Sequence, residues 1–132
     1  MDAIYDRTIL DVQRVKDLKS KINQSGWDSL TDNEKTEWIN GMKGALNYSD
    51  LNRIEGNLQS ISNQCNFGFT QKTDWRIGDF PIVTDYFRIR ENTNIVRISP
   101  FGWKCTSNTP VMPINNYGKI NSIEKILFNS YN

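Results

Sequence analysis

The sequence contains no histidine, and only two of its 132 residues are alanine. The absence of histidine removes the usual general base near neutral pH, the Ser-His and Cys-His nucleophile pairs, and the commonest transition-metal ligand. The acidic side chains offer no convincing catalytic pair, and no cluster of metal-ligating side chains is visible. Composition therefore points away from enzymes, and we predict no catalytic residue, no cofactor and no metal.

An excess of charge of one sign is also lacking. The chain has 16 basic and 15 acidic side chains and a formal net charge of +1, which argues against a protein that neutralises nucleic-acid phosphates. The segments around residues 31–65 could be taken for a helix-turn-helix. The second helix would then begin with Asp50, Arg53 and Glu55, which is not a basic surface. We therefore expect no nucleic-acid partner and keep a small DNA-binding regulator as a minor alternative.

Long hydrophobic runs are absent, because no apolar stretch approaches the roughly 20 residues that span a bilayer. The residues at 1–7 also lack the basic start and apolar core of a signal peptide. We expect synthesis in a cytoplasm and no membrane partner. Cysteine is scarce: Cys65 and Cys105 lie outside any CxxC pair. In a reducing compartment we expect two buried or half-buried thiols, with a disulfide as the alternative.

What the sequence does contain is apolar side chains at steps of three and four residues, the spacing of amphipathic helices. This spacing predicts five helices, which cover approximately residues 8–23, 31–41, 49–65, 84–99 and 118–129. The side chains expected on their buried faces are Ile9, Val12, Val15, Leu18 and Ile22; Trp38, Ile39 and Met42; Leu51, Ile54, Leu58, Ile61 and Cys65; Ile82, Tyr86, Ile89, Thr93 and Val96; and Ile120, Ile123 and Leu127.

The expected fold is mainly α, in a single domain over residues 1–132. An N-terminal three-helix unit would cover residues 1–65. The remaining residues, 66–132, would form a loop-helix-loop-helix segment that packs on it. Two long irregular connections, at 66–81 and 100–117, contain at most a small β-hairpin.

Polar residues mark where several of these helices begin and where turns occur. Thr8 with Asp11 and Thr31 with Glu34 have the spacing of capping boxes, and Ser49 is a plausible N-cap. Gly41 and Gly44 leave room for close approach of another backbone. In the loop before the fourth helix, Asp74 and Asp79 are expected to act in turns and caps. Glu124 and Lys125 are expected on a solvated helix face.

The aromatic side chains of the two irregular connections form the main candidate site. They either fold back and cover the helices, or they anchor a partner protein, since aromatic residues and Met are enriched at the centres of interfaces. Carbohydrate stacking on Trp103 is a third option. The residues that we single out as partner-binding are Phe101, Trp103, Val111, Met112, Trp75 and Phe80.

Five segments in order carry a resemblance that covers nearly the whole chain. They are IYDRT (4–8) with DV (11–12), GWDSLT (26–31) running into EKTEW (34–38), GMKGALNYSDLNRIE (41–55), KTDW (72–75) and NSIEKIL (121–127). Together they resemble a helical module of tail structural proteins from phages and prophages of Firmicutes, especially clostridial phages. The long central segment is the most specific of the five. The helix at 82–94 departs from the pattern, and the loop at 101–113 has no match in it.

This resemblance implies a non-enzymatic structural or adaptor subunit of a phage tail, or of a phage-tail-like particle such as a bacteriocin. Its partners would be other tail, baseplate or tail-fibre proteins, and particle symmetry would supply multiple copies. Its location would be the virion or the particle, after synthesis in the host cytoplasm. The resemblance brings no catalytic residue. The alternatives are a host-surface receptor-binding module that recognises glycans, a small DNA-binding regulator, and a cell-wall hydrolase.

Overall fold

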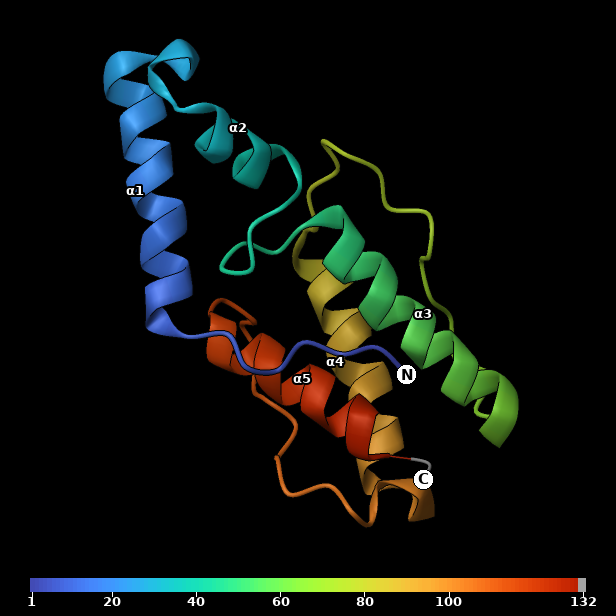
Figure 1. The fold of residues 1–132 in the computed structure, drawn as a ribbon. Helices are drawn as coiled ribbons and strands as arrows, with labels where there is room; N and C mark the ends of the chain where they lie inside the picture. The colour runs from blue at the N-terminus through green and yellow to red at the C-terminus, as the bar shows by residue number, and fades with distance from the viewer. Residues whose placement is uncertain (131–132) are drawn as a thin grey trace. The chain divides into compact units, whose positions relative to one another are not determined.

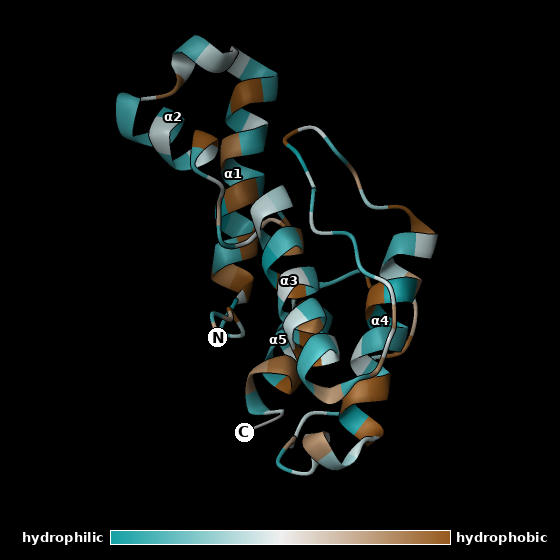
Figure 2. Cartoon of the chain, turned by 90° about the vertical axis from the view of Figure 1, so that its right-hand side faces the viewer, coloured by the Kyte–Doolittle hydropathy of each residue, from teal (hydrophilic) through white to brown (hydrophobic). Residues whose placement is uncertain are grey.

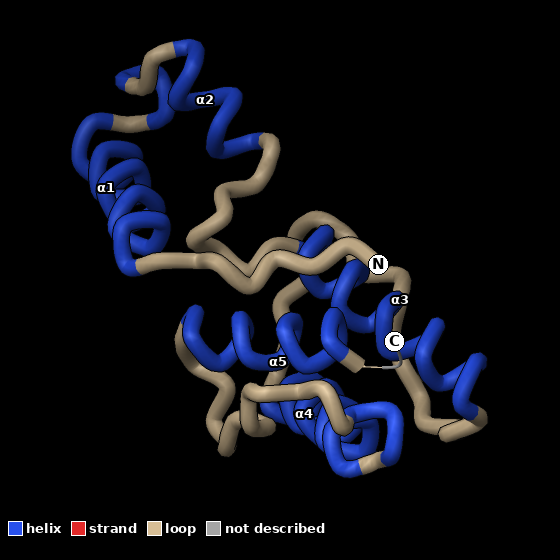
Figure 3. Tube along the Cα trace, turned by 60° about the horizontal axis from the view of Figure 1, so that its bottom comes forward, coloured by secondary structure: helices blue, strands red, loops and turns tan. Residues whose placement is uncertain are grey.

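The computed structural model describes residues 1–130, and helices dominate them (Figure 3). The α-helices are α1 (Ile9–Ser25), α2 (Asp32–Ile39), α3 (Tyr48–Cys65), α4 (Val83–Ile98) and α5 (Tyr117–Asn129). Two short 3-10 helices, η1 (Trp27–Ser29) and η2 (Pro100–Gly102), follow α1 and α4. The mainly α fold with five helices is confirmed, and residues 1–130 contain no β-strand, so the hairpin that we allowed for is not formed in them.

The chain divides into two compact units (Figure 1). The larger unit combines Met1–Asp6 with Tyr48–Asn132, and the smaller unit is Arg7–Asn47. The expected boundary after residue 65 is therefore misplaced, because α3 packs with α4 and α5. The apolar stripe of α3 predicts that this helix packs against others. The stripe does not specify the partner helices. From the order of the helices in the sequence we expected α1 and α2, whereas α3 contacts α4 and α5.

The smaller unit is organised by its two capping boxes. The Thr8 side chain accepts from the Asp11 N–H and the Asp11 carboxylate accepts from the Thr8 N–H, and Thr31 with Glu34 repeats the arrangement at α2. Both capping predictions are confirmed. The core is small and consists of three buried side chains, with Val15, Ile22 and Trp38 packed against them; the three are Leu18, Leu30 and Met42.

Gly44 is the point at which the chain after α2 returns to the first turn of α1. A Cβ atom there would overlap the carbonyl oxygen of Asp11, so the position accepts no side chain without a backbone shift. The predicted close approach at Gly44 is thereby confirmed. Two predicted core residues of this unit, Ile9 and Ile39, are exposed. Ile9 is the first residue of α1 and Ile39 is the last residue of α2.

The core of the larger unit lies between α3, α4 and α5, which contact one another pairwise. Most of the predicted stripes are confirmed. The buried apolar side chains of these three helices are Leu51, Ile54, Leu58, Ile61, Ile89, Val96, Ile120, Ile123, Ile126 and Leu127. Ile82 is an exception, since it is exposed at the N-cap of α4. Ser49 is not an N-cap, because α3 already begins at Tyr48.

Two smaller predictions about the connections are also confirmed. Asp79 acts in a turn, as expected: its N–H donates to the Arg76 carbonyl at 3.0 Å and its carboxylate accepts from the Arg76 N–H at 2.8 Å. Cys65 is a half-buried free thiol and Cys105 a buried one. Burial raises the pKa of both thiols, so neither is activated as a nucleophile. None of the helices within residues 1–130 combines the length and hydropathy that a membrane crossing requires.

Candidate interaction surface

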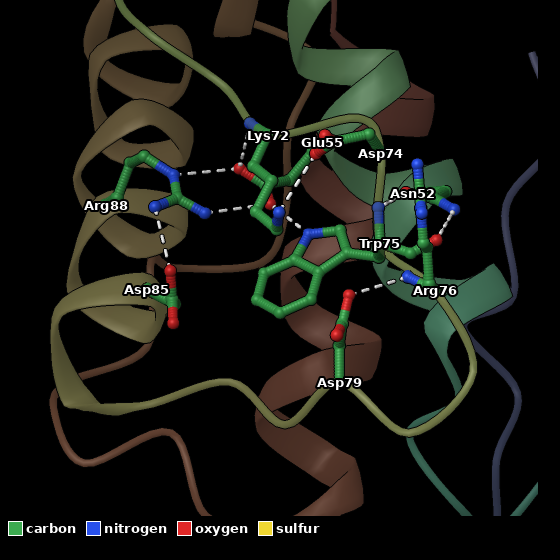
Figure 4. A network of polar contacts seen from close by, with 9 residues as sticks. All are labelled: Asn52, Glu55, Lys72, Asp74, Trp75, Arg76, Asp79, Asp85 and Arg88. Carbon is green, nitrogen blue, oxygen red and sulfur yellow. Dashed lines mark hydrogen bonds and ion pairs between the residues drawn. The ribbon is translucent and has the colours of Figure 1, made fainter.

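Trp75, one of the predicted partner-binding residues, is only 4% exposed. Its indole Nε1 donates to Glu55 Oε2 at 2.6 Å (Figure 4). Its backbone is held by Asn52, whose Oδ1 accepts from the Trp75 N–H at 2.8 Å and whose Nδ2 donates to the Trp75 carbonyl at 2.9 Å. The partner-binding prediction for Trp75 is therefore wrong. The indole covers the helices of the larger unit. Its N–H and the backbone N–H and carbonyl of Trp75 all have hydrogen-bond partners within that unit.

Glu55, on α3, is the centre of a buried polar network (Figure 4). Arg88 Nε donates to Oε1 and Arg88 Nη2 to Oε2, each at 2.9 Å, and the Lys72 N–H donates to Oε1 at 3.0 Å. With the indole of Trp75, the carboxylate accepts four hydrogen bonds. The hydrogen bond to Glu55 raises the pKa of Arg88 above its ordinary value. A carboxylate that accepts this many hydrogen bonds is held in one conformation and joins the elements that donate to it.

Glu124, on α5, occupies a second network of the same kind. The carboxylate is 1% exposed, and it accepts from Arg53 Nε at 2.8 Å, Arg53 Nη2 at 2.9 Å and the Ile4 N–H at 3.0 Å. Arg53 Nη2 also donates to Asp50 at 2.7 Å. Burial opposes the charge of Arg53, but its hydrogen bonds to the two carboxylates outweigh this and raise its pKa. The prediction that Glu124 lies on a solvated face is wrong, because Arg53 on α3 neutralises it inside the larger unit.

The two networks share one construction. In each, an aspartate three residues before an arginine on one helix orients the arginine, which pairs with a buried glutamate of another helix. Each glutamate also accepts a backbone N–H from an extended segment, Met1–Asp6 in one case and the connection before α4 in the other. The Asp-x-x-Arg spacing is shared by both networks, but it also occurs at 11–14, where Arg14 pairs with Glu37 in a solvent-accessible ion pair. The spacing alone therefore does not indicate a buried network.

Four of the remaining predicted anchors lie on the connection between α4 and α5, which we call the anchor loop (Pro100–Asn116). Trp103 is 74% exposed and Val111 67% exposed, whereas Met112 is half-buried. Phe101 is 38% exposed, and its ring meets the ring of Phe67 edge-on, with the centroids 6.0 Å apart. The anchor loop thus presents Trp103 and Val111 most fully and uses part of Phe101 to pack on its own unit.

The anchor loop is fixed to the larger unit through its carbonyl oxygens. Arg97 Nε donates to the Ser107 carbonyl at 2.9 Å and Arg90 Nε to the Pro110 carbonyl at 3.0 Å. Lys119 Nζ donates to the Pro113 carbonyl at 2.6 Å. Ile114 and Cys105 are buried within the loop, which runs from the end of α4 to the start of α5 (Figure 1). The loop therefore lies over the core and at the same time presents apolar side chains in a defined conformation.

A second group of exposed apolar side chains lies where the chain enters α4. Phe80, a predicted anchor, is 84% exposed. The other exposed apolar residues of this group are Ile77, Ile82, Val83 and Phe87. The hydrophobic colouring of the chain just before α4 is visible in Figure 2. Of this group the sequence analysis named only Phe80 as an anchor, although Val83 and Phe87 are spaced as on one face of a helix and lie outside the predicted stripe of α4.

The described residues, 1–130, contain no group of three or more Cys, Asp or Glu side chains placed to hold a metal ion. Comparison of the chain with protein-family models, with curated proteins and with solved structures found no match. The features of the molecule that bear on its function are therefore its exposed apolar side chains and the five segments that resemble tail proteins.

Proposed function

We propose that this protein is a non-enzymatic structural or adaptor subunit of a phage tail or a phage-tail-like particle. It would dock at the baseplate or at the attachment of a fibre, through apolar and aromatic anchors. The observation that carries the proposal is the anchor loop, on which Trp103 and Val111 are exposed while the loop backbone is held at three carbonyl oxygens. Association of this kind gains free energy from burying apolar surface, and a pre-ordered loop reduces its entropic cost.

The resemblance to tail proteins supports the proposal that the protein belongs to such a particle. The buried networks support the proposal that its role is structural. The glutamates that could have offered acid–base chemistry are saturated by arginine and backbone donors. Particle symmetry would add the modest affinities of several copies, since linked sites bind far more tightly than one. Phe80 and its exposed neighbours provide further apolar surface on the same unit.

The test is a binding assay with purified tail, baseplate and fibre proteins and the variants Trp103→Ala, Val111→Ala and their combination. An interface anchor of this kind typically contributes about 2 kcal/mol or more, so Trp103→Ala should weaken binding roughly 30-fold. Leu10→Ala is the matched control, because Leu10 is similarly exposed but lies in the smaller unit. Unchanged binding by a folded Trp103→Ala/Val111→Ala protein would remove the anchor loop from the mechanism.

A glycan-binding module is the second candidate, because the exposed ring of Trp103 could stack on a sugar. Lys104 Nζ lies 5.3 Å from the centroid of that ring and already occupies space over it. A glycan array compares the two candidates, because binding that disappears in Trp103→Ala would favour the sugar over the protein partner.

A further inference from the structure

The anchor loop lies in a part of the chain that has no acidic residue. Between Glu91 and Glu124 the sequence contains Arg97, Lys104 and Lys119 but neither Asp nor Glu. This differs from the chain as a whole, in which acidic and basic side chains are almost equal in number. The exposed aromatic and aliphatic anchors are therefore surrounded, along the sequence, by positive charge only.

Two of these three basic side chains form hydrogen bonds to uncharged groups of the loop. Arg97 and Lys119 donate to carbonyl oxygens of the loop, which are uncharged acceptors. Of the two flanking glutamates, Glu124 is buried and paired with Arg53, and Glu91 is paired with Arg90. Both carboxylates thus have cations of their own. Arg97 and Lys119, two of the three basic side chains that hold the loop backbone, therefore belong to the same segment that exposes Trp103 and Val111.

We infer that the anchor loop binds an acidic protein segment, in which carboxylates flank the apolar side chains that pack on Trp103 and Val111. This inference rests on the proposed docking function and names the chemistry of the partner. Complementary charge would steer the encounter and fix the register of the two surfaces, while the apolar contact would supply most of the affinity.

A nucleic acid is the other polyanion that such a surface suggests, since exposed aromatic rings can stack on bases. The observations favour the protein. The loop has few cations, and Arg97 and Lys119 donate hydrogen bonds to its backbone, which leaves fewer donors for phosphates. Val111 and Met112, which have no ring to stack on a base, are half of the predicted anchors there.

The experiment changes the charge of the loop without touching its hydrogen bonds. Thr106 and Asn108 are exposed positions on the loop, so Thr106→Glu/Asn108→Asp adds negative charge and Thr106→Lys/Asn108→Lys adds positive charge. Thr106→Gln is the uncharged control. The probe is a fluorescently labelled peptide of alternating Glu and Phe residues, compared with a Lys/Phe peptide, a Glu/Ser peptide and a labelled oligo-dT.

We expect the full-length protein to bind the Glu/Phe peptide in preference to the other three probes. The acidic variant should bind it roughly 2- to 30-fold more weakly and the lysine variant correspondingly more tightly, as expected for two exposed charge pairs. Thr106→Gln should bind as the wild type does. Raising the salt concentration should weaken binding by the wild type and reduce the differences between the variants.

Three outcomes would overturn the inference: equal binding of the Lys/Phe peptide, no difference between the two charge variants, or preferential binding of oligo-dT. These outcomes are distinguishable from failure of the proposed function. If a tail protein no longer binds Trp103→Ala/Val111→Ala but binds both charge variants as it binds the wild type, the docking role would stand and the acidic partner would be refuted. A tail set that contains no partner at all would refute the docking role itself.

Discussion

The two units of this protein are stabilised in different ways. In the larger unit, α3, α4 and α5 bury ten apolar side chains together with the carboxylates of Glu55 and Glu124. In the smaller unit only Leu18, Leu30 and Met42 form the buried core. Its ion pairs, such as Arg14 with Glu37 and Lys21 with Glu34, are solvent-accessible.

The difference follows from size. A segment of about 40 residues buries too little apolar surface for a substantial core, so short-range features carry more of its stability. In the smaller unit these features are two capping boxes and a glycine contact. The larger unit can bury charge, because its core is large enough to surround complete arginine–glutamate pairs with further donors.

The largest effect is expected from breaking a buried pair in the larger unit. Glu55→Ala would leave the Arg88 guanidinium and the Trp75 indole without their main acceptor, and such a change typically lowers the free energy of unfolding by about 3–5 kcal/mol. Chemical denaturation followed by tryptophan fluorescence would measure it. Asp74→Ala is the control, because the Lys72–Asp74 pair is exposed and such pairs contribute about 1 kcal/mol or less. Equal costs for the two variants would show that the Glu55 network is dispensable.

The next effect compares the two cores directly. Leu58→Ala in the larger unit and Leu18→Ala in the smaller unit each remove a fully buried side chain, at a cost of about 2–5 kcal/mol. Hydrogen exchange should show that Leu18→Ala exposes the amides of α1 and α2 while α3, α4 and α5 stay protected. Loss of protection in all five helices of the Leu18→Ala protein would mean that the chain unfolds as one cooperative body.

Two glycines offer a smaller contrast with opposite signs. Gly44→Ala forces a Cβ atom against the Asp11 carbonyl and should destabilise the smaller unit by about 1–3 kcal/mol, as overpacking generally does. Gly56→Ala lies within α3, where a Cβ atom meets nothing within 4 Å. This change should stabilise the larger unit by about 0.5–1 kcal/mol. Melting temperatures of the two variants would test both signs, and a neutral Gly44→Ala would refute the close contact.

The smallest effect concerns pH and the smaller unit. Lys21 and the Thr31 N–H lower the pKa of Glu34 from 4.5 to about 2. A carboxyl group whose pKa is lower in the folded state stabilises that state above its unfolded pKa. The contribution should therefore be complete above about pH 4.5 and be lost as the pH falls toward 2. The melting temperature of Glu34→Gln should fall less steeply between pH 4.5 and 2 than that of the wild type. An equal fall in both proteins would show that Glu34 does not contribute to the acid sensitivity.

The sequence predicted the local features of the fold well. The five helices, the capping boxes at Thr8 and Thr31 and the turn before Asp79 all depend on residues within a few positions of one another. The close approach at Gly44 was also expected, although the atom that it approaches was not. Of the residues singled out as partner-binding, Trp103, Val111 and Phe80 are exposed, whereas Trp75 is buried. The partner-binding role of the exposed residues stays a prediction.

The sequence by itself determined where helices begin and end and which of their faces are apolar, because hydrophobic periodicity and capping act over one or two turns. Only the tertiary structure decided that α3 joins α4 and α5 and that Glu55 and Glu124 are buried. It also decided that the carbonyls of the anchor loop are held by Arg90, Arg97 and Lys119. The physical reason is that a buried charge is tolerated only beside a partner from another element, and no spacing along the chain specifies that partner.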